Sequence, residues 1–395
     1  MTTIGHKLPK GVIALGLVSL LMDLSSEMIH SLLPVFLVTV LGASALSVGI
    51  IEGIAEATAA IAKVFSGVLS DWMGRRKPLV LLGYGVAALT KPLFPLATGL
   101  GAVLTARFLD RIGKGIRGAP RDALIADITP QPLRGAAYGL RQAMDTVGAF
   151  TGPLVAMALM AATLDNFRLV FWIATIPAFL CVLLITFGVE EPEVTRPAAQ
   201  PRLPVSRANL RRLPARFWWV VAFAAVLTLA RFSEAFLLLR AENVGLAVTW
   251  VPMILIVMNI VYAASAYPFG KLSDNGSRSR LLAWGICFLI AADLVLATAT
   301  NIWAVGLGAA AWGLHMGATQ GLLSALVAEA APADLRGTAF GVFNLASGVA
   351  LLAASVIAGG LWSLLGPAMT FYAGALFSAI ALTGLLIKQI GVHAK

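Results

Sequence analysis

The chain is a succession of long apolar runs separated by short polar segments. A run of about 20 apolar residues is long enough for a helix to cross the roughly 30 Å hydrocarbon core of a bilayer. Barrel strands would need short alternating segments, which are absent. The pattern predicts an all-α membrane protein with twelve transmembrane helices. We expect these helices at residues 11–41, 46–70, 78–98, 101–127, 134–160, 168–188, 217–241, 247–272, 279–298, 302–328, 335–362 and 366–388.

Composition agrees with lipid as the outer solvent. Hydrophobic residues make up 59% of the 395 residues and charged residues only 12%, about half the charged share of a soluble domain. Cys181 and Cys287 lie inside apolar runs, so they imply neither a disulfide framework nor a metal site. The N-terminus has no small-residue cleavage site after a short apolar run, and the first run is therefore expected to be a retained span.

One polar segment, residues 189–216, is longer than the others and rich in Pro and Arg. It predicts a cytoplasmic linker between an N-terminal six-helix half, residues 1–188, and a C-terminal half, residues 217–395. Basic residues concentrate in alternate loops, which places both termini in the cytoplasm and the protein in the inner (plasma) membrane. Arg168 and Arg240 are the exceptions. Because the basic residues flank spans and form no single patch, the net charge of +10 does not indicate nucleic-acid binding.

The two halves repeat each other at an offset of about 202–207 residues. Several matches in the same order at one offset indicate a duplication, here two pseudo-symmetric bundles. Parallel repeats of this kind place a substrate site near the midplane between the halves. The matching pairs are 67–85 with 270–285, 125–139 with 327–341, and Ser26-Glu27 with Ser233-Glu234.

The segment Gly67-x-Leu69-Ser70-Asp71-x-x-Gly74-Arg75-Arg76-Lys77 resembles the loop motif of the major facilitator superfamily between helices two and three. The second half keeps a reduced copy around Gly270, Leu272 and Asp274. The resemblance implies a monomeric secondary transporter that carries a small molecule by alternating access. On the fifth span, Gly139, Gly148, Gly152 and Pro153 match a Gly-x8-Gly-x3-Gly-Pro pattern that this superfamily associates with proton-coupled antiporters. Ala156 and Met157 replace its usual closing glycine pair.

The loop motif also predicts a gate. The Asp71 carboxylate can cap a helix N-terminus, where the macrodipole favours negative charge, and Arg75 can pair with Asp127 at the end of the fourth span. The alternative is a solvated turn with a basic cluster. The predicted gating residues are Gly67, Asp71, Gly74, Arg75, Arg76, Asp127, and Asp274 and Glu329 in the second half.

Ionisable residues inside apolar spans are costly and usually face a protein interior or a cavity. Asp23, Glu27 and His30 are spaced to share one face of the first span, and Glu234 repeats Glu27 in the second half. Burial and a neighbouring acid both favour the neutral form of a carboxyl, so these four residues are the predicted proton-coupling groups. The alternative for His30 is a hydrogen-bonding core residue.

Charged and polar residues also lie mid-span elsewhere. Arg107 resembles the family arginine of the fourth helix, whereas Asp110 and Arg111 depart from the family pattern. Both signs of charge predict a polar, zwitterionic or charged substrate. The alternative is that Arg107 with Asp110, Arg141 with Asp145, and Glu56 with Lys63 only hold helices together. The predicted substrate-binding residues are Glu56, Arg107, Asp110, Arg111, Arg141, Asp145, Arg231, His315 and Gln320.

No catalytic constellation is present, so the sequence predicts a transporter and not an enzyme. No Gly-rich phosphate loop ending in Lys-Ser/Thr occurs, so a proton gradient and not ATP or a cofactor is the expected driving force. His30, His315 and the acids form no recognised metal-ligand set. Three hypotheses stay open: proton-coupled antiport that exports a small polar or amphipathic molecule, uptake of a metabolite by symport or uniport, and a transporter-like receptor without flux.

Overall fold

The computed structural model describes residues 8–73, 75–191, 210–275, 278–332 and 335–393. Four residues that the sequence assigned to the gate or the substrate site are affected by the gaps. Gly74 lies outside the described residues, as do the side chains of Asp71, Asp274 and Gln320.

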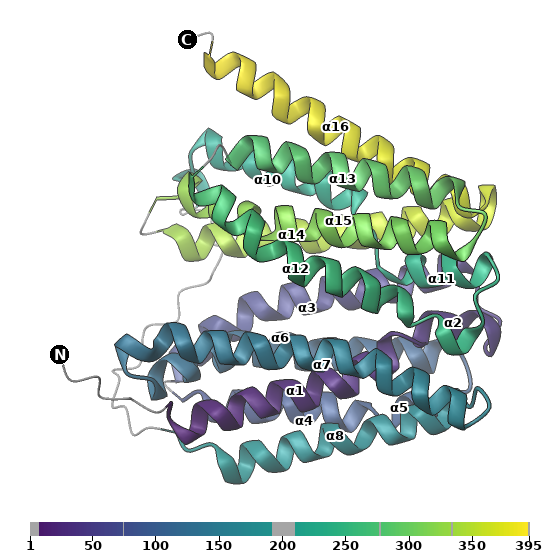
Figure 1. The fold of residues 1–395 in the computed structure, drawn as a ribbon. Helices are drawn as coiled ribbons and strands as arrows, with labels where there is room; N and C mark the ends of the chain where they lie inside the picture. Colours follow the sequence, from purple (N-terminus) through teal and green to yellow (C-terminus); the bar gives the residue numbers. More distant parts are fainter. Residues whose placement is uncertain (1–7, 74, 192–209, 276–277, 333–334, 394–395) are drawn as a thin grey trace. The chain divides into compact units, whose positions relative to one another are not determined.

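The described residues form helices and no strand (Figure 1). The helices before the linker are α1 (Lys10–His30), α2 (Leu33–Thr39), α3 (Ala45–Met73), α4 (Lys77–Thr90), α5 (Leu93–Leu96), α6 (Leu100–Ile128), the short η1 (Gln131–Leu133), α7 (Arg134–Ala162) and α8 (Phe167–Gly188). Those after it are α10 (Ala215–Ala230), α11 (Ala235–Asn243), the short η2 (Val248–Trp250), α12 (Met253–Asn275), α13 (Arg278–Thr298), α14 (Ile302–Ala330), α15 (Arg336–Leu365) and α16 (Pro367–His393).

Within the described part, 10 helical segments are long and apolar enough to cross a membrane. Helices α6 and α14, of 29 residues each, are also long enough to span and bring the total to the predicted twelve. The many charged residues of α6 make it less apolar than the other ten segments, but they do not shorten it. The expected all-α, multi-pass membrane fold is therefore confirmed.

Three of the predicted spans are broken and not continuous. The first bends at Ser31 and Leu32, between α1 and α2, and the third at Lys91 and Pro92, between α4 and α5. Pro34 and Pro92 lie at or just after these two breaks. A proline lacks the N–H donor of the helix, and its ring clashes with the carbonyl four residues earlier. The seventh span is interrupted from Arg231 to Glu234, where the chain leaves α10 and begins α11.

The helices group into two compact units. Unit 1 comprises 1–32 and 58–203, and unit 2 comprises 33–57 and 204–395. Most of the expected N-terminal half is thus in unit 1. Helix α2 and the first part of α3, however, pack with the helices of unit 2.

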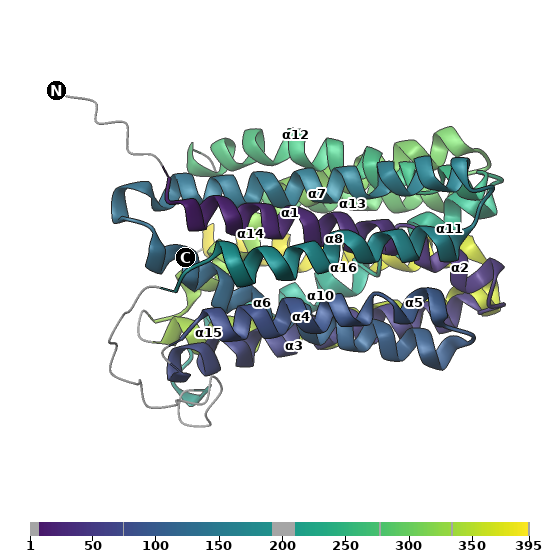
Figure 2. The same ribbon diagram turned by 90° about the horizontal axis from the view of Figure 1, so that it is seen from below.

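In unit 1, α1 packs against both α7 and α8, and α4 packs against α6 (Figure 2). Apolar side chains from these five helices form its buried core, among them Leu15 of α1, Tyr84 of α4 and Cys181 of α8. In unit 2, α14 packs against α12 and α13, and α16 packs against α13. Glycines bring the first part of α3 onto α15, because a Cβ on Gly49 would lie 2.2 Å from the Ser355 carbonyl oxygen.

The two basic residues that depart from the loop-charge pattern have a structural role. Arg168 donates to the carbonyl oxygens of Pro95 and Ala97 at 3.0 and 3.1 Å. Arg240 of α11 donates to the carbonyl oxygens of Leu296, Ala297 and Ala299 at 3.0, 3.3 and 2.7 Å. These carbonyls have no helical partner at a C-terminus, and a cation also complements the dipole there.

Candidate functional site

Two glycines of α7 bring that helix directly against the acidic face of α1. A Cβ on Gly148 would lie 2.7 Å from the Leu20 carbonyl oxygen, and a Cβ on Gly152 would lie 2.6 Å from the Cβ of Glu27. Both distances are too short for any side chain. A Cβ built on Gly139, the first glycine of the pattern, would have no atom within 4 Å. The two close glycines therefore position Asp23 and Glu27.

A polar chain runs from α1 to α6. The Nε2 atom of His30 lies 3.1 Å from an Arg111 NH2 nitrogen, and its Nδ1 atom lies 3.8 Å from a Glu27 carboxylate oxygen. A guanidinium can only donate, so Nε2 is the acceptor and a neutral His30 carries its proton on Nδ1. That proton points towards Glu27. Three predicted residues are thus brought together in one proton-bearing chain.

Asp110 of α6 pairs with a lysine that the sequence analysis did not single out. The Lys91 Nζ lies 2.9 Å from the Asp110 Oδ1, and it also donates to the Ser26 hydroxyl at 2.9 Å. Lys91 is 1% exposed and Asp110 4%. The break between α4 and α5 places this lysine inside unit 1, where it links three helices. Asp110 is therefore paired with Lys91, a partner on another element that spacing along the helix did not predict.

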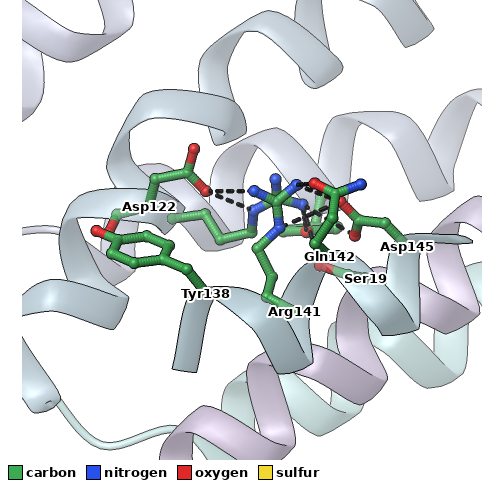
Figure 3. Close-up of polar contacts among 8 residues, drawn as sticks. Ser19, Asp122, Tyr138, Arg141, Gln142 and Asp145 are labelled. Atoms are coloured by element: carbon green, nitrogen blue, oxygen red, sulfur yellow. Dashed lines mark hydrogen bonds and ion pairs between the residues drawn. The ribbon is translucent and has the colours of Figure 1, made fainter. Parts of the chain in front are cut away.

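A second group of charges lies on α6 and α7 (Figure 3). Arg141 of α7 contacts Asp145, as the spacing predicted, and also donates to the Asp122 carboxylate at 3.2 Å. Tyr138 donates to the Asp122 carbonyl oxygen at 2.9 Å. Arg141 and Asp145 thus form part of a larger network, and not a single pair.

Arg121 completes this network from α6. It donates to the Ser19 hydroxyl at 3.0 Å and to the Tyr84 hydroxyl at 3.2 Å. Its guanidinium also lies 3.8 Å from a carboxylate oxygen of Asp145. Charge-assisted hydrogen bonds are the stronger class, so Arg121 connects α1, α4 and α7 through α6.

The predicted contact with Asp127 is made by Arg76 and not by Arg75. The Arg76 Nε lies 3.5 Å from an Asp127 carboxylate oxygen, and its NH1 donates to the Ser70 hydroxyl at 2.7 Å. Arg76 is 7% exposed, whereas Arg75 is exposed. At the start of α4 the chain turns Arg76 inwards, and the neighbouring arginine consequently points to solvent.

The N-terminus of α4 is capped from a distant segment. The Glu191 carboxylate, just after α8, accepts from the backbone N–H groups of Arg76 and of Lys77, the latter at 3.1 Å. The capping role predicted for Asp71 stays a prediction, because its side chain lies outside the described residues; the cap of α4 is Glu191. A carboxylate at a helix N-terminus satisfies orphan donors and complements the dipole.

Arg76→Ala is expected to lower the thermal unfolding midpoint of the purified protein in detergent, because it leaves Asp127 and Ser70 without this partner. Hydrogen bonds to charged groups contribute about 1.5–3 kcal/mol each. Arg75→Ala is the matched control and should change stability by no more than about 0.5 kcal/mol. Equal losses in both variants would show that the Arg76 contacts contribute nothing beyond loop charge.

In unit 2, Arg231 and Glu234 flank the break between α10 and α11. His315 of α14 is fully buried, and its Nδ1 lies 2.8 Å from the Gly285 carbonyl oxygen. Glu56 lies on the part of α3 that belongs to unit 2. Glu329 lies 3.9 Å from Arg216, and both side chains are largely exposed.

Sequence reasoning missed several charges inside the two units. Lys91 and Arg117 are buried in unit 1, and Asp293 of α13 is fully buried in unit 2. Arg117 stacks over the Tyr84 ring, 4.6 Å from its centroid. Arg121 and Asp122, which contact each other and the charges of α7, were also missed. The signal was available, because each of these residues is a charge inside a predicted span.

Comparisons with known proteins agree with this architecture. The family model of the Major Facilitator Superfamily matches residues 15–350 and 232–391. The MFS-type transporter MJ1317 of Methanocaldococcus jannaschii is 34% identical over 392 residues, which cover 98% of this chain and 96% of that protein. A probable 4-methylmuconolactone transporter of Cupriavidus pinatubonensis is 28% identical, with 92% and 89% covered.

The fold is also found among solved structures. The crystal structure of a mutant of the nucleoside transporter NupG aligns with a TM-score of 0.79 at 14% identity and covers 95% of this chain and 99% of that one. At this identity the likeness concerns the fold alone. With the family model matched along most of its length, this chain belongs to the Major Facilitator Superfamily of membrane transporters.

Proposed function

We propose that the protein is a proton-coupled antiporter that exports a small polar or amphipathic molecule across the inner membrane by alternating access. It works as a monomer in the lipid bilayer, with both termini in the cytoplasm. The proton gradient drives it, without ATP or a bound cofactor. The observation that carries this proposal is the chain Glu27–His30–Arg111, which joins an acid, a neutral imidazole and a cation on two helices.

The chain supplies a physical route for coupling. With Glu27 ionised, the imidazole N–H faces a carboxylate at one end, and a guanidinium donates to the imidazole at the other. Protonation of Glu27 removes its charge and weakens its attraction for His30. The contact between α1 and α6 then loosens. Asp23 lies one helical turn before Glu27, and Glu234 holds the repeat-related position in unit 2, so these two acids complete the proposed set of proton carriers.

Close packing of α7 on α1 supports the antiporter reading over simple helix contact. The glycines press α7 against the very turn that carries Glu27. A shift of this turn on protonation is therefore transmitted to α7, because packed elements do not deform continuously. The same glycine pattern was the feature that favoured export at the level of sequence.

The interior of unit 1 favours a substrate that carries an acidic or strongly polar group. Along α6 the side chains of Arg107, Arg111 and Arg117 are buried, and buried guanidinium groups suit carboxylate or phosphate recognition. The relative named as a probable 4-methylmuconolactone transporter supports a small organic solute. The proposed substrate-binding groups also include Asp110, Arg141 and Asp145 of this interior, and Glu56, Arg231, His315 and Gln320 of unit 2.

Glu27→Gln is expected to fold and to lose transport driven by a pH gradient, because the amide cannot release a proton. The measurement uses proteoliposomes with an imposed pH gradient and a panel of organic anions, cations, zwitterions and amphipathic dyes, with an internal pH dye. Asp165→Asn is the matched control. Asp165 lies in the α7–α8 turn with φ +60°, a conformation that Asn tolerates, and its removal should leave coupling intact.

Retention of full coupling in Glu27→Gln would remove Glu27 from the mechanism. A thermal-shift screen at pH 6 and pH 8 gives a second test, since a ligand that binds the folded state raises its melting temperature. Competition between proton and substrate predicts greater stabilisation at pH 8 than at pH 6, with the difference lost in Glu27→Gln. Solute uptake that is independent of Glu27 would instead support the second function, facilitated or symport uptake of a metabolite.

A further inference from the structure

A carboxyl that the proposed cycle does not use lies deep in unit 2. Asp293 of α13 is 0% exposed. Neither of its carboxylate oxygens has a hydrogen-bond partner among the described residues. A buried ionised carboxylate without a partner costs far more than a buried neutral acid, and buried polar groups are normally bonded. The arrangement therefore needs an explanation.

The internal repeat identifies the counterpart of Asp293 in unit 1. At an offset of about 202 residues, α13 and α14 match the segment that holds α4, α5 and α6. Equivalent contacts confirm the register. A Cβ on Gly83 would approach the backbone nitrogen of Arg117 at 2.7 Å, and a Cβ on Gly285 would approach Thr319 at 2.4 Å. In this register Asp293 occupies the position of Lys91.

The two positions differ in their partners. In unit 1 the ammonium of Lys91 lies 2.9 Å from the Asp110 carboxylate. The unit 2 equivalent of Asp110 is Trp312, an indole that packs against Phe232 with 5.3 Å between the ring centroids. The repeat thus keeps a buried ionisable group at this depth but replaces its counter-charge with an aromatic ring.

The space around Asp293 is apolar and tight. A Cβ on Gly374 of α16 would lie 2.6 Å from the Asp293 Oδ2 and 3.0 Å from Phe232. One turn further along α16, the Ser378 hydroxyl is also buried without a hydrogen-bond partner among the described residues. On this side the carboxyl has room for a bound proton and not for a solvated ion.

Among the described residues, no charged or titratable group of the surrounding elements hydrogen-bonds to the carboxyl, Tyr372 of α16 and Tyr262 of α12 included. Arg240 of α11 donates to the carbonyl oxygens at the end of α13. The Nδ1 atom of His315 of α14 hydrogen-bonds to the carbonyl oxygen of Gly285. Arg231 and Glu234 flank the break that supplies Phe232. On α12, Lys271 is exposed, as is Arg280 at the start of α13. Within the described part of unit 2, none of these groups forms a hydrogen bond with Asp293.

We propose that Asp293 is a proton-binding site of unit 2, occupied by a proton in the arrangement of α13 and α16 described here. The proton forms an O–H bond with one carboxylate oxygen and leaves as a free proton when water or a cation reaches that oxygen. Release therefore requires α13 and α16 to separate, so proton occupancy and the packing of these helices are coupled. This inference does not depend on antiport or on the role of Glu27.

The test compares Asp293→Asn with Asp110→Asn in purified full-length protein. Infrared difference spectra of the wild type against Asp293→Asn are expected to show loss of a protonated carboxylic C=O band at neutral pH. The same substitution at Asp110 should remove no such band, because that carboxylate is ionised beside Lys91.

Unfolding midpoints across pH give the second readout. An acid that is neutral when folded and ionised when unfolded makes the wild type less stable as pH rises, tenfold in the folding equilibrium per pH unit. The stability of Asp293→Asn is expected not to fall with pH in this way. Relative to the wild type, its unfolding midpoint should therefore rise at alkaline pH. Asp110→Asn should be less stable than the wild type at every pH.

An unchanged carboxylic band in Asp293→Asn would overturn the proposal, as would an unchanged pH slope. Asp293→Leu is the second variant if the amide is poorly tolerated, since an apolar group of similar size suits the same pocket. Loss of folding in both variants would show that the ionised carboxylate is required, which also overturns the proposal.

Discussion

Gly152→Leu is expected to separate α1 from α7 and to leave little folded protein. Even the first atom of a side chain at residue 152 would lie 2.6 Å from the Cβ of Glu27 and 3.0 Å from the Leu24 carbonyl oxygen. Backbone atoms cannot rotate away as a side chain can. Overpacking of a core costs about 1–3 kcal/mol, and a contact with backbone belongs at the upper end. The measurement is the yield of monodisperse protein and its thermal unfolding midpoint in detergent.

Gly139→Leu is the matched control, since it makes the same change on the same helix. No atom lies within 4 Å of the Cβ position at Gly139, so the leucine meets open space and the midpoint should move little. A comparable loss in both variants would mean that the leucine acts through α7 itself and that the close approach of α1 is unimportant. Gly152→Ala should show a smaller loss in the same direction.

The pattern of apolar runs predicted the helices closely where the runs are uninterrupted. The fourth span was expected at 101–127 and is α6, Leu100–Ile128; the sixth was expected at 168–188 and is α8, Phe167–Gly188. Hydropathy reports which residues prefer lipid, and a continuous helix is the simplest way to satisfy their backbone. It carries no information on breaks, because Lys91-Pro92 and Arg231–Glu234 lie within runs that are apolar on average.

The members of the candidate site were predicted better than their partners. Spacing along one helix placed Asp23, Glu27 and His30 on one face, and it paired Arg141 with Asp145. Contacts between helices are not encoded in spacing. The sequence therefore predicted Arg75 as the ion-pair partner of Asp127. In the structure the partner is Arg76, because the chain turns this residue inwards at the start of α4. Glu191 was assigned to the linker, yet it caps α4.

Mutual pairing explains how α6 tolerates so many charges at membrane depth. An isolated charge in a span is costly, but the acids of this helix contact cations on other elements. Asp110 meets Lys91 beyond α4, and Asp122 meets Arg141 of α7. Such pairs hold the helices of unit 1 together.

The Lys91–Asp110 pair is expected to behave as a unit when either side chain is removed. Breaking a buried pair by deleting one partner costs about 3–5 kcal/mol, whereas replacing both by apolar groups is often neutral. We therefore expect Lys91→Met and Asp110→Leu each to lower the unfolding midpoint strongly, and the double variant to recover most of the loss. A double-mutant cycle on purified protein measures this coupling.

The two single variants should not be equal. Removal of Lys91 leaves Asp110 on a helix that also carries Arg107 and Arg111, next to it in sequence or one turn away, so part of the attraction remains. Removal of Asp110 leaves Lys91 buried near Arg111 and Arg117 with no opposite charge from that position. Asp110→Leu is thus expected to be the more damaging change. Additive losses in the double variant would mean that Lys91 and Asp110 are stabilised independently and that the pair does not link α6 to the break before α5. Equal losses in the singles would mean that the arginines of α6 do not compensate for the missing lysine.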